Sequence, residues 1–271
     1  MHSASELNFE GGTSGISTRG SDKFECEAQN LFILEMVRIR YSSSMTVPQT
    51  RTLLSRVALL AATAIILLTE PAARTAIAAP ASFVRDPSAW VIGPLVRGRN
   101  YSVGMPLHPT AGRNGTWQID LPRHPGSVHY VTFPHGSLQG KTRIVMRYRL
   151  EAAPGVRVHA STAPGSPGII TPYFQRYGDN WTARGRFEAF RWYGTFATQE
   201  ITPGEHMIVA PLNANWTAVE RSSAQGSPAA FREALADADQ VGFVLGGGDG
   251  AGHGVYATGP ARLVVTQFSV E

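Results

Sequence analysis

The chain has 271 residues, of which 43% are hydrophobic and 16% are charged, so it is long enough to bury a full hydrophobic core. Its formal net charge is only +4, and after residue 79 it holds 17 Lys and Arg against 13 Asp and Glu. Because these cations are scattered rather than gathered in a dense basic stripe, we expect no nucleic-acid partner.

Residues 45–79 have the parts of a secretory signal peptide. Arg51 and Arg56 form a positively charged n-region, and Val57–Leu68 is an uncharged, mostly apolar run of 12 residues. That run is too short to cross about 30 Å of hydrocarbon comfortably, but it suits a signal peptide. Small residues at Ala76–Ala81 offer cleavage sites. We therefore expect a secreted or periplasmic protein with no membrane contact after cleavage; the alternative is an uncleaved membrane anchor.

Residues 1–44 do not fit this pattern, because a signal peptide works at the amino terminus. We expect translation to begin at Met45, which makes residues 1–44 a non-native extension caused by a start-site error. The alternative is a long cytoplasmic lead before an anchor. Residues 80–271 show no internal repeat or linker and predict a single domain. The only cysteine is Cys26, so that domain has no disulfide, thiolate nucleophile or cysteine metal site.

Apolar residues of this domain recur with period two or in short solid runs, which is typical of strands. The predicted strands are Thr116–Leu121, Val128–Phe133, Thr142–Glu151, Val156–Ala160, Ile169–Gln175, Phe187–Phe196, His206–Pro211, Val241–Leu245 and Ala261–Val270. The clearest alternation sets Arg143, Arg147 and Arg149 opposite a row of apolar side chains. That pattern predicts a sheet with one solvated face and one buried face.

One helix is predicted over Ala229–Ala238, with Ser227 as its cap and Pro228 in its first turn. Frequent Pro-Gly pairs separate the predicted strands. Together these elements predict an all-β fold, an antiparallel two-sheet β-sandwich of the jelly-roll type with one short helix.

The stretch from Tyr173 to Phe196 sets nine aromatic residues among four arginines, around a Gly-Asp-Asn turn. Aromatic rings with a polar handle can stack on sugar faces, and Arg, Asp and Asn can bond hydroxyls or carboxylates. The predicted stacking residues are Tyr177, Trp181, Trp192 and Tyr193, and the predicted hydrogen-bonding residues are Arg176, Asp179, Arg184 and Arg191. The competing interpretation is that half of these aromatics face the core, because strand side chains alternate.

No catalytic residue is predicted. The glycine-rich run 246–254 lacks the Gly-Lys-Ser/Thr ending of a phosphate loop and is interpreted as a hairpin connection, in which Asp249 and His253 could still meet a ligand or metal. The histidines show no helical metal spacing, which leaves only a zinc site formed across the sheet near His129 and His135. No cofactor is expected except a calcium ion, which would be ordinary in such a sandwich although no calcium-loop motif is present.

The closing residues 240–247, the glycine-rich run and residues 259–270 resemble the last two strands of galactose-binding-like jelly rolls, such as carbohydrate-binding modules. The resemblance implies a β-sandwich and glycan binding. We therefore expect an exported, non-catalytic protein that binds a carbohydrate or similar polar ligand. The alternatives are a polysaccharide lyase or hydrolase on the same scaffold, and a structural or interaction protein of the cell envelope.

Overall fold

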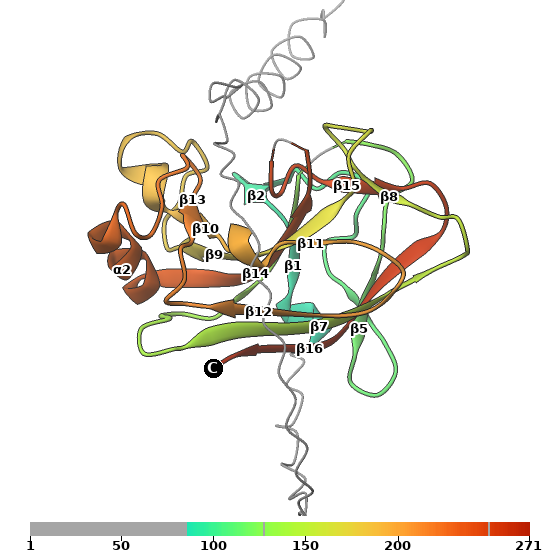
Figure 1. Ribbon diagram of the computed structural model, residues 1–271, viewed down its shortest axis with the longest axis horizontal. Helices are drawn as coiled ribbons and strands as arrows, with labels where there is room; N and C mark the ends of the chain where they lie inside the picture. Colours follow the sequence, from blue (N-terminus) through green and yellow to red (C-terminus); the bar gives the residue numbers. More distant parts are fainter. Residues whose placement is uncertain (1–85, 127, 249) are drawn as a thin grey trace, which may run out of the picture. The chain divides into compact units, whose positions relative to one another are not determined.

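Two antiparallel sheets face each other in the computed structural model, which describes residues 86–271 apart from residues 127 and 249 (Figure 1). The predicted extension 1–44 and the predicted signal peptide 45–79 lie outside the described residues. All described residues fall within one compact unit. No helix in this part of the chain is long and apolar enough to cross a membrane.

The larger sheet has seven strands in the order β1-β6-β14-β9-β10-β13, with β11 also paired to β9. Their bounds are β1 Val91–Gly93, β6 His129–Pro134, β14 Ala238–Gly246, β9 Ile169–Arg176, β10 Arg191–Tyr193, β13 Thr217–Ala218 and β11 Gln199–Glu200. The smaller sheet has five strands in the order β12-β7-β16-β5-β4. Their bounds are β12 Gly204–Pro211, β7 Arg143–Ala152, β16 Ala261–Val270, β5 Trp117–Asp120 and β4 Thr110–Ala111.

Two short ribbons and a few helical turns complete the described part. The ribbons pair β15 (Val255–Ala257) with β8 (Val158–Ala160) and β2 (Leu95–Val96) with β3 (Arg99–Asn100). The helices are α2 (Pro228–Ala236) and the 3-10 turns η1 (Pro87–Ala89), η2 (Gly185–Ala189) and η3 (Thr195–Ala197). The prediction of a two-sheet antiparallel β-sandwich with one short helix is therefore confirmed.

Aromatic side chains fill the space between the two sheets. The ring of Trp90 lies 4.8 Å from that of Trp117 and 5.0 Å from that of Phe268 on the smaller sheet. On the larger sheet it lies 4.6 Å from the ring of Phe133. Since such rings each bury a large apolar area, this cluster accounts for a stable sandwich without disulfides.

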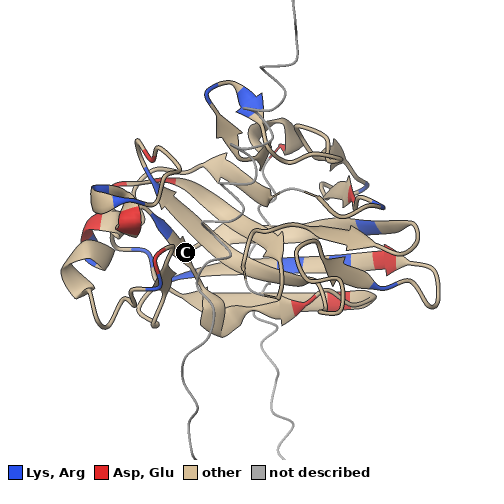
Figure 2. Cartoon of the chain, turned by 90° about the horizontal axis from the view of Figure 1, so that it is seen from above, with Lys and Arg blue, Asp and Glu red and all other residues tan. Residues whose placement is uncertain are grey.

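The outer face of the smaller sheet is polar, as the alternation in β7 predicts. Arg143 pairs with Glu271, with 2.6 Å between Nη2 and Oε2, and Arg149 pairs with Glu151 across 2.5 Å. Figure 2 shows that positive and negative segments are interspersed along the strands. These exposed pairs keep one face of the sheet solvated while the opposite face packs on the core.

Three local predictions need correction. The predicted strand Phe187–Phe196 is divided into η2, β10 and η3, because Gly185 has a positive φ and donates its N–H to Glu188, which closes a turn. The glycine-rich run does not join two paired strands, because β14 pairs with β6 and β9 whereas β15 pairs with β8, although Gly247 and Gly250 form an antiparallel bridge within it. Helix α2 begins at Pro228 as expected, but the Ser227 side chain makes no capping hydrogen bond.

Candidate functional site

The stretch predicted to bind ligand consists of the end of β9, strand β10 and the loop between them. The two strands are antiparallel neighbours, with Arg191 opposite Gln175 and Tyr193 opposite Tyr173. Because paired residues share a face of the sheet, these four side chains lie on the face away from the core. The loop between the strands contains Trp181.

Trp192 lies on the other face, and the prediction that it stacks on a ligand is wrong. Its side chain has no exposed surface and its ring lies 4.8 Å from the ring of Phe231 in the core. Its indole Nε1 donates a 2.9 Å hydrogen bond to the carbonyl of Ala189. The physical reason is the period of two along β10, which turns Trp192 inward when Arg191 and Tyr193 turn outward.

Asp179 and Arg191 form an ion pair that is withdrawn from solvent. Nε of Arg191 lies 3.0 Å from Oδ2 of Asp179, and the two side chains are 1% and 0% exposed. Gln175 donates a 3.0 Å hydrogen bond to the same carboxylate oxygen. Burial raises the pKa of the Asp179 carboxyl, and the Arg191 guanidinium opposes that rise. Since neither side chain reaches the surface, the prediction that they bond a ligand directly is not met.

Three tyrosines form a buried layer beside this ion pair. The hydroxyls of Tyr130 and Tyr193 are 2.8 Å apart, and Tyr173 donates a 3.0 Å hydrogen bond to Oε1 of Gln175. The three side chains are at most 6% exposed. Burial raises the pKa of each phenol, so all three remain protonated at neutral pH. Tyr193 therefore belongs to a hydrogen-bonded layer rather than to an open stacking surface.

The main chain of Trp181 is held by both members of the ion pair. Its N–H donates to Oδ1 of Asp179 across 3.1 Å, and its carbonyl accepts from Nη2 of Arg191 across 3.4 Å. Trp181 has a φ of 66°, a left-handed conformation that a bulky side chain adopts only when its surroundings impose it. The guanidinium carbon of Arg191 lies 5.0 Å from the indole centroid, and the ring of Tyr130 meets the indole edge to face at 5.1 Å.

Trp181 differs from the other tryptophans of the protein in its exposure. The sequence has five tryptophans, and the other four, Trp90, Trp117, Trp192 and Trp216, are all 0% exposed. Trp181 is half-buried, and the neighbouring Tyr177 is 78% exposed. The loop therefore presents one aromatic ring of fixed orientation and one free aromatic ring to solvent.

The remaining predicted residues have different surroundings. Nη2 of Arg176 contacts Glu233 at 2.8 Å and Asp237 at 2.7 Å, which ties the end of β9 to α2. Its guanidinium also lies 4.5 Å from the ring centroid of Phe190. Arg184 is exposed at the end of the loop. Arg176 is thus engaged within the protein, and Arg184 lies at the surface three residues after Trp181.

The sequence did not single out Tyr130, Tyr173 or Gln175. The alternation along β9 could have placed Tyr173 and Gln175 on the face opposite Phe174. Tyr173 and Gln175 lie near Tyr130 only because β6, β14 and β9 pair in a particular register. These strands are far apart in sequence, so no local sequence pattern predicts that register.

No group of three or more His, Cys, Asp or Glu side chains is placed to hold a metal ion among the described residues. His129, proposed from the sequence for a zinc site across the sheet, is fully buried and accepts a 3.1 Å hydrogen bond from Val255 N–H at Nδ1. Asp249 lies outside the described residues. The described histidines therefore do not assemble the zinc site that the sequence left open.

No model of a known protein family matches the chain, and no curated protein matches it.

Proposed function

We propose that this chain is an exported, non-catalytic protein that binds a carbohydrate or a similar polar ligand at the loop 177–184. The observation that supports this proposal is the partial exposure of Trp181 in an orientation fixed by Asp179 and Arg191. An aromatic ring that is already ordered loses little conformational entropy when a ligand stacks on it. The resemblance of the last strands to carbohydrate-binding modules favours the same ligand class.

The proposed contacts combine stacking with hydrogen bonds. The indole of Trp181 would cover a C–H face of a sugar ring, and Tyr177 would add a second aromatic surface. Arg184 would bond hydroxyls or carboxylates at the rim. Asp179 and Arg191 would act beneath the ligand, as residues that position Trp181 rather than as ligand contacts. Tyr193 would act through Tyr130, whose ring meets the indole.

Binding without catalysis is favoured over the lyase alternative by the state of the tyrosines. A lyase that removes a proton beside a uronate carboxylate needs a base with a pKa near the working pH. Burial instead raises the pKa values of Tyr130, Tyr173 and Tyr193. The arginine beside them is paired with Asp179 and would not be free to neutralise a substrate carboxylate.

A glycan screen of the purified exported protein, with and without calcium, tests this proposal. We expect at least one glycan to bind, and binding to be lost in Trp181→Ala. Phe196→Ala is the matched control, because Phe196 is an aromatic residue 45% exposed on η3, outside the loop. Both variants should melt cooperatively, which shows that lost binding does not result from unfolding.

A glycan hit that survives in Trp181→Ala would contradict the proposed site. An array without hits would contradict the proposed function and favour the envelope-interaction alternative. The region to test next would be residues 95–107, where Leu95, Val103 and Leu107 are each more than 40% exposed.

A further inference from the structure

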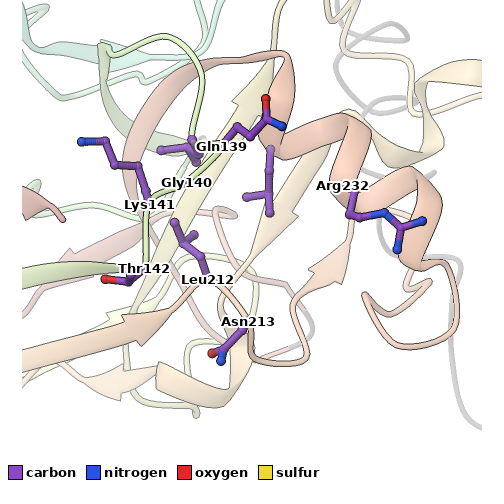
Figure 3. Close-up of a pocket in the computed structure, with 9 residues that line it drawn as sticks. Gln139, Gly140, Lys141, Thr142, Leu212, Asn213 and Arg232 are labelled. Carbon is purple, nitrogen blue, oxygen red and sulfur yellow. The ribbon is translucent and has the colours of Figure 1, made fainter.

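A hollow of about 390 Å³ lies between the β6–β7 connection, the chain after β12, and helix α2 (Figure 3). Its lining residues are Leu138, Gln139, Gly140, Lys141, Thr142, Leu212, Asn213, Arg232 and Leu235. This volume is within the range of small-molecule sites, which is roughly 300–1,000 Å³. None of these residues belongs to the loop around Trp181.

The hollow is preformed, because main-chain hydrogen bonds tie its three walls together. The N–H of Leu138 donates to the carbonyl of Leu235 across 2.7 Å, which joins the connection to α2. The N–H of Leu212 donates to the carbonyl of Thr142 across 2.8 Å, which joins it to the chain after β12. A ligand would therefore not have to order these segments on binding.

The floor of the hollow is apolar. Leu138 is 1% exposed, Leu212 is 3% exposed, and Leu235 is half-buried. Figure 3 shows the Leu212 side chain beside Thr142 and Asn213. Because Leu138 and Leu212 are already almost fully buried, the apolar surface that a ligand would remove from water is mainly that of Leu235.

The rim has two cations that pair with no acid within the described part of the protein, Lys141 and Arg232. Lys141 is also the single lysine after residue 79. Arg143, which follows Thr142, is engaged with Glu271, and Arg176 is engaged with Glu233 on α2.

Glu233, which follows Arg232 in sequence, and Glu271, whose main chain hydrogen-bonds to Thr142 beside Lys141, are therefore already paired with other arginines. The main-chain carbonyl of Glu271 is likewise occupied, by the N–H groups of Thr142 and Arg143. The side-chain amides of Gln139 and Asn213 make no hydrogen bond among the residues described. Positive charge and unused donors thus surround an apolar floor.

We propose that this hollow binds an organic anion, a carboxylate attached to an apolar body. The apolar body would lie mainly against Leu235, and the amides would orient the carboxylate. In Figure 3 the charged ends of Lys141 and Arg232 point outward on opposite sides. Both side chains are exposed and unpaired, so they can turn over a bound carboxylate.

Octanoate and its neutral analogue octanamide test the proposal by isothermal titration of the full exported protein. We expect octanoate to bind at least about tenfold more tightly than octanamide, and its affinity to fall as salt is raised. Lys141→Gln combined with Arg232→Gln should remove this preference and leave octanamide binding unchanged. Arg113→Gln, at an exposed arginine outside the hollow, should change neither.

Three outcomes would overturn the proposal: no octanoate binding, equal affinity for the two probes, or an octanoate affinity that the double variant does not lower. Since Lys141 and Arg232 are exposed and unpaired, their replacement should leave the melting temperature within the error of the wild type. The glycan site at Trp181 shares no residue with this test, so either proposal can fail alone.

Discussion

Asp179 and Arg191 form an ion pair with 3.0 Å between Oδ2 and Nε, and each also hydrogen-bonds to the main chain of Trp181. The two residues are 12 positions apart, on a loop and on β10, and they meet because β10 returns beside β9. A buried ion pair contributes little net stability compared with an apolar substitute, but it fixes geometry. Here the geometry that it fixes is that of the one tryptophan with exposed surface.

Arg191→Met should lower the free energy of unfolding by about 3–5 kcal/mol, because it leaves the Asp179 carboxylate buried without a counter-charge. Urea unfolding followed by circular dichroism measures this loss. Arg262→Met is the matched control: Arg262 pairs with Asp120 at 2.7 Å, but their side chains are 43% and 72% exposed. We expect that control to cost less than about 1 kcal/mol. Equal losses in the two variants would show that the Asp179–Arg191 pair has no special role.

Trp192→Ala and Trp181→Ala should separate a core tryptophan from a surface one. Trp192 has no exposed surface, so its truncation should cost about 3–5 kcal/mol of unfolding free energy. Trp181→Ala should cost clearly less, because part of the indole faces solvent and Ala keeps the main-chain hydrogen bonds. Urea unfolding of both variants gives the comparison, and a larger loss for Trp181→Ala would place its indole in the core.

Stability should fall as the pH is lowered from about 6.5 to about 4, in part through His129. Burial lowers the pKa of His129 to about 4 in the folded protein, and a hydrogen bond to the backbone of Val103 opposes this only in part. Between the two values the unfolded chain binds a proton that the folded protein does not, so acid favours unfolding. The full difference corresponds to about 3 kcal/mol.

His129→Asn isolates this contribution, because the Asn side-chain oxygen can accept the Val255 N–H in place of Nδ1. Unfolding free energies of wild type and variant should be measured at pH 7 and pH 4.5. The wild type should lose more stability than the variant over this interval. Parallel losses would show that His129 does not titrate with a lowered pKa.

The sequence was sufficient for elements whose signal is local. Period two along β7 correctly set Arg143, Arg147 and Arg149 on the solvated face, and Pro228 correctly marked the start of α2. The prediction of one strand over Phe187–Phe196 was wrong, because the chain forms a turn at Gly185 instead of pairing as an extended strand. Aromatic composition alone cannot decide whether a segment forms a turn or a hydrogen-bonded strand.

The site was less accessible to sequence reasoning than the fold. The stretch 173–196 does contain Trp181, Asp179 and Arg191, but the sequence assigned Asp179 and Arg191 to the ligand rather than to Trp181. Which side of a strand is buried depends on partners that are distant in sequence, as the inward position of Trp192 shows. The hollow at Lys141 joins three segments through main-chain hydrogen bonds, and no residue pattern encodes that meeting.

The most direct test of the central claim follows the five indole N–H signals of the ¹⁵N-labelled protein during titration with a glycan selected by the screen. Trp181→Phe assigns the signal of Trp181. Our account predicts that this signal shifts with ligand while those of Trp90, Trp117, Trp192 and Trp216 stay in place, since the latter are fully buried. A ligand that binds without moving the Trp181 signal, or that moves another indole signal instead, would contradict the proposed binding site.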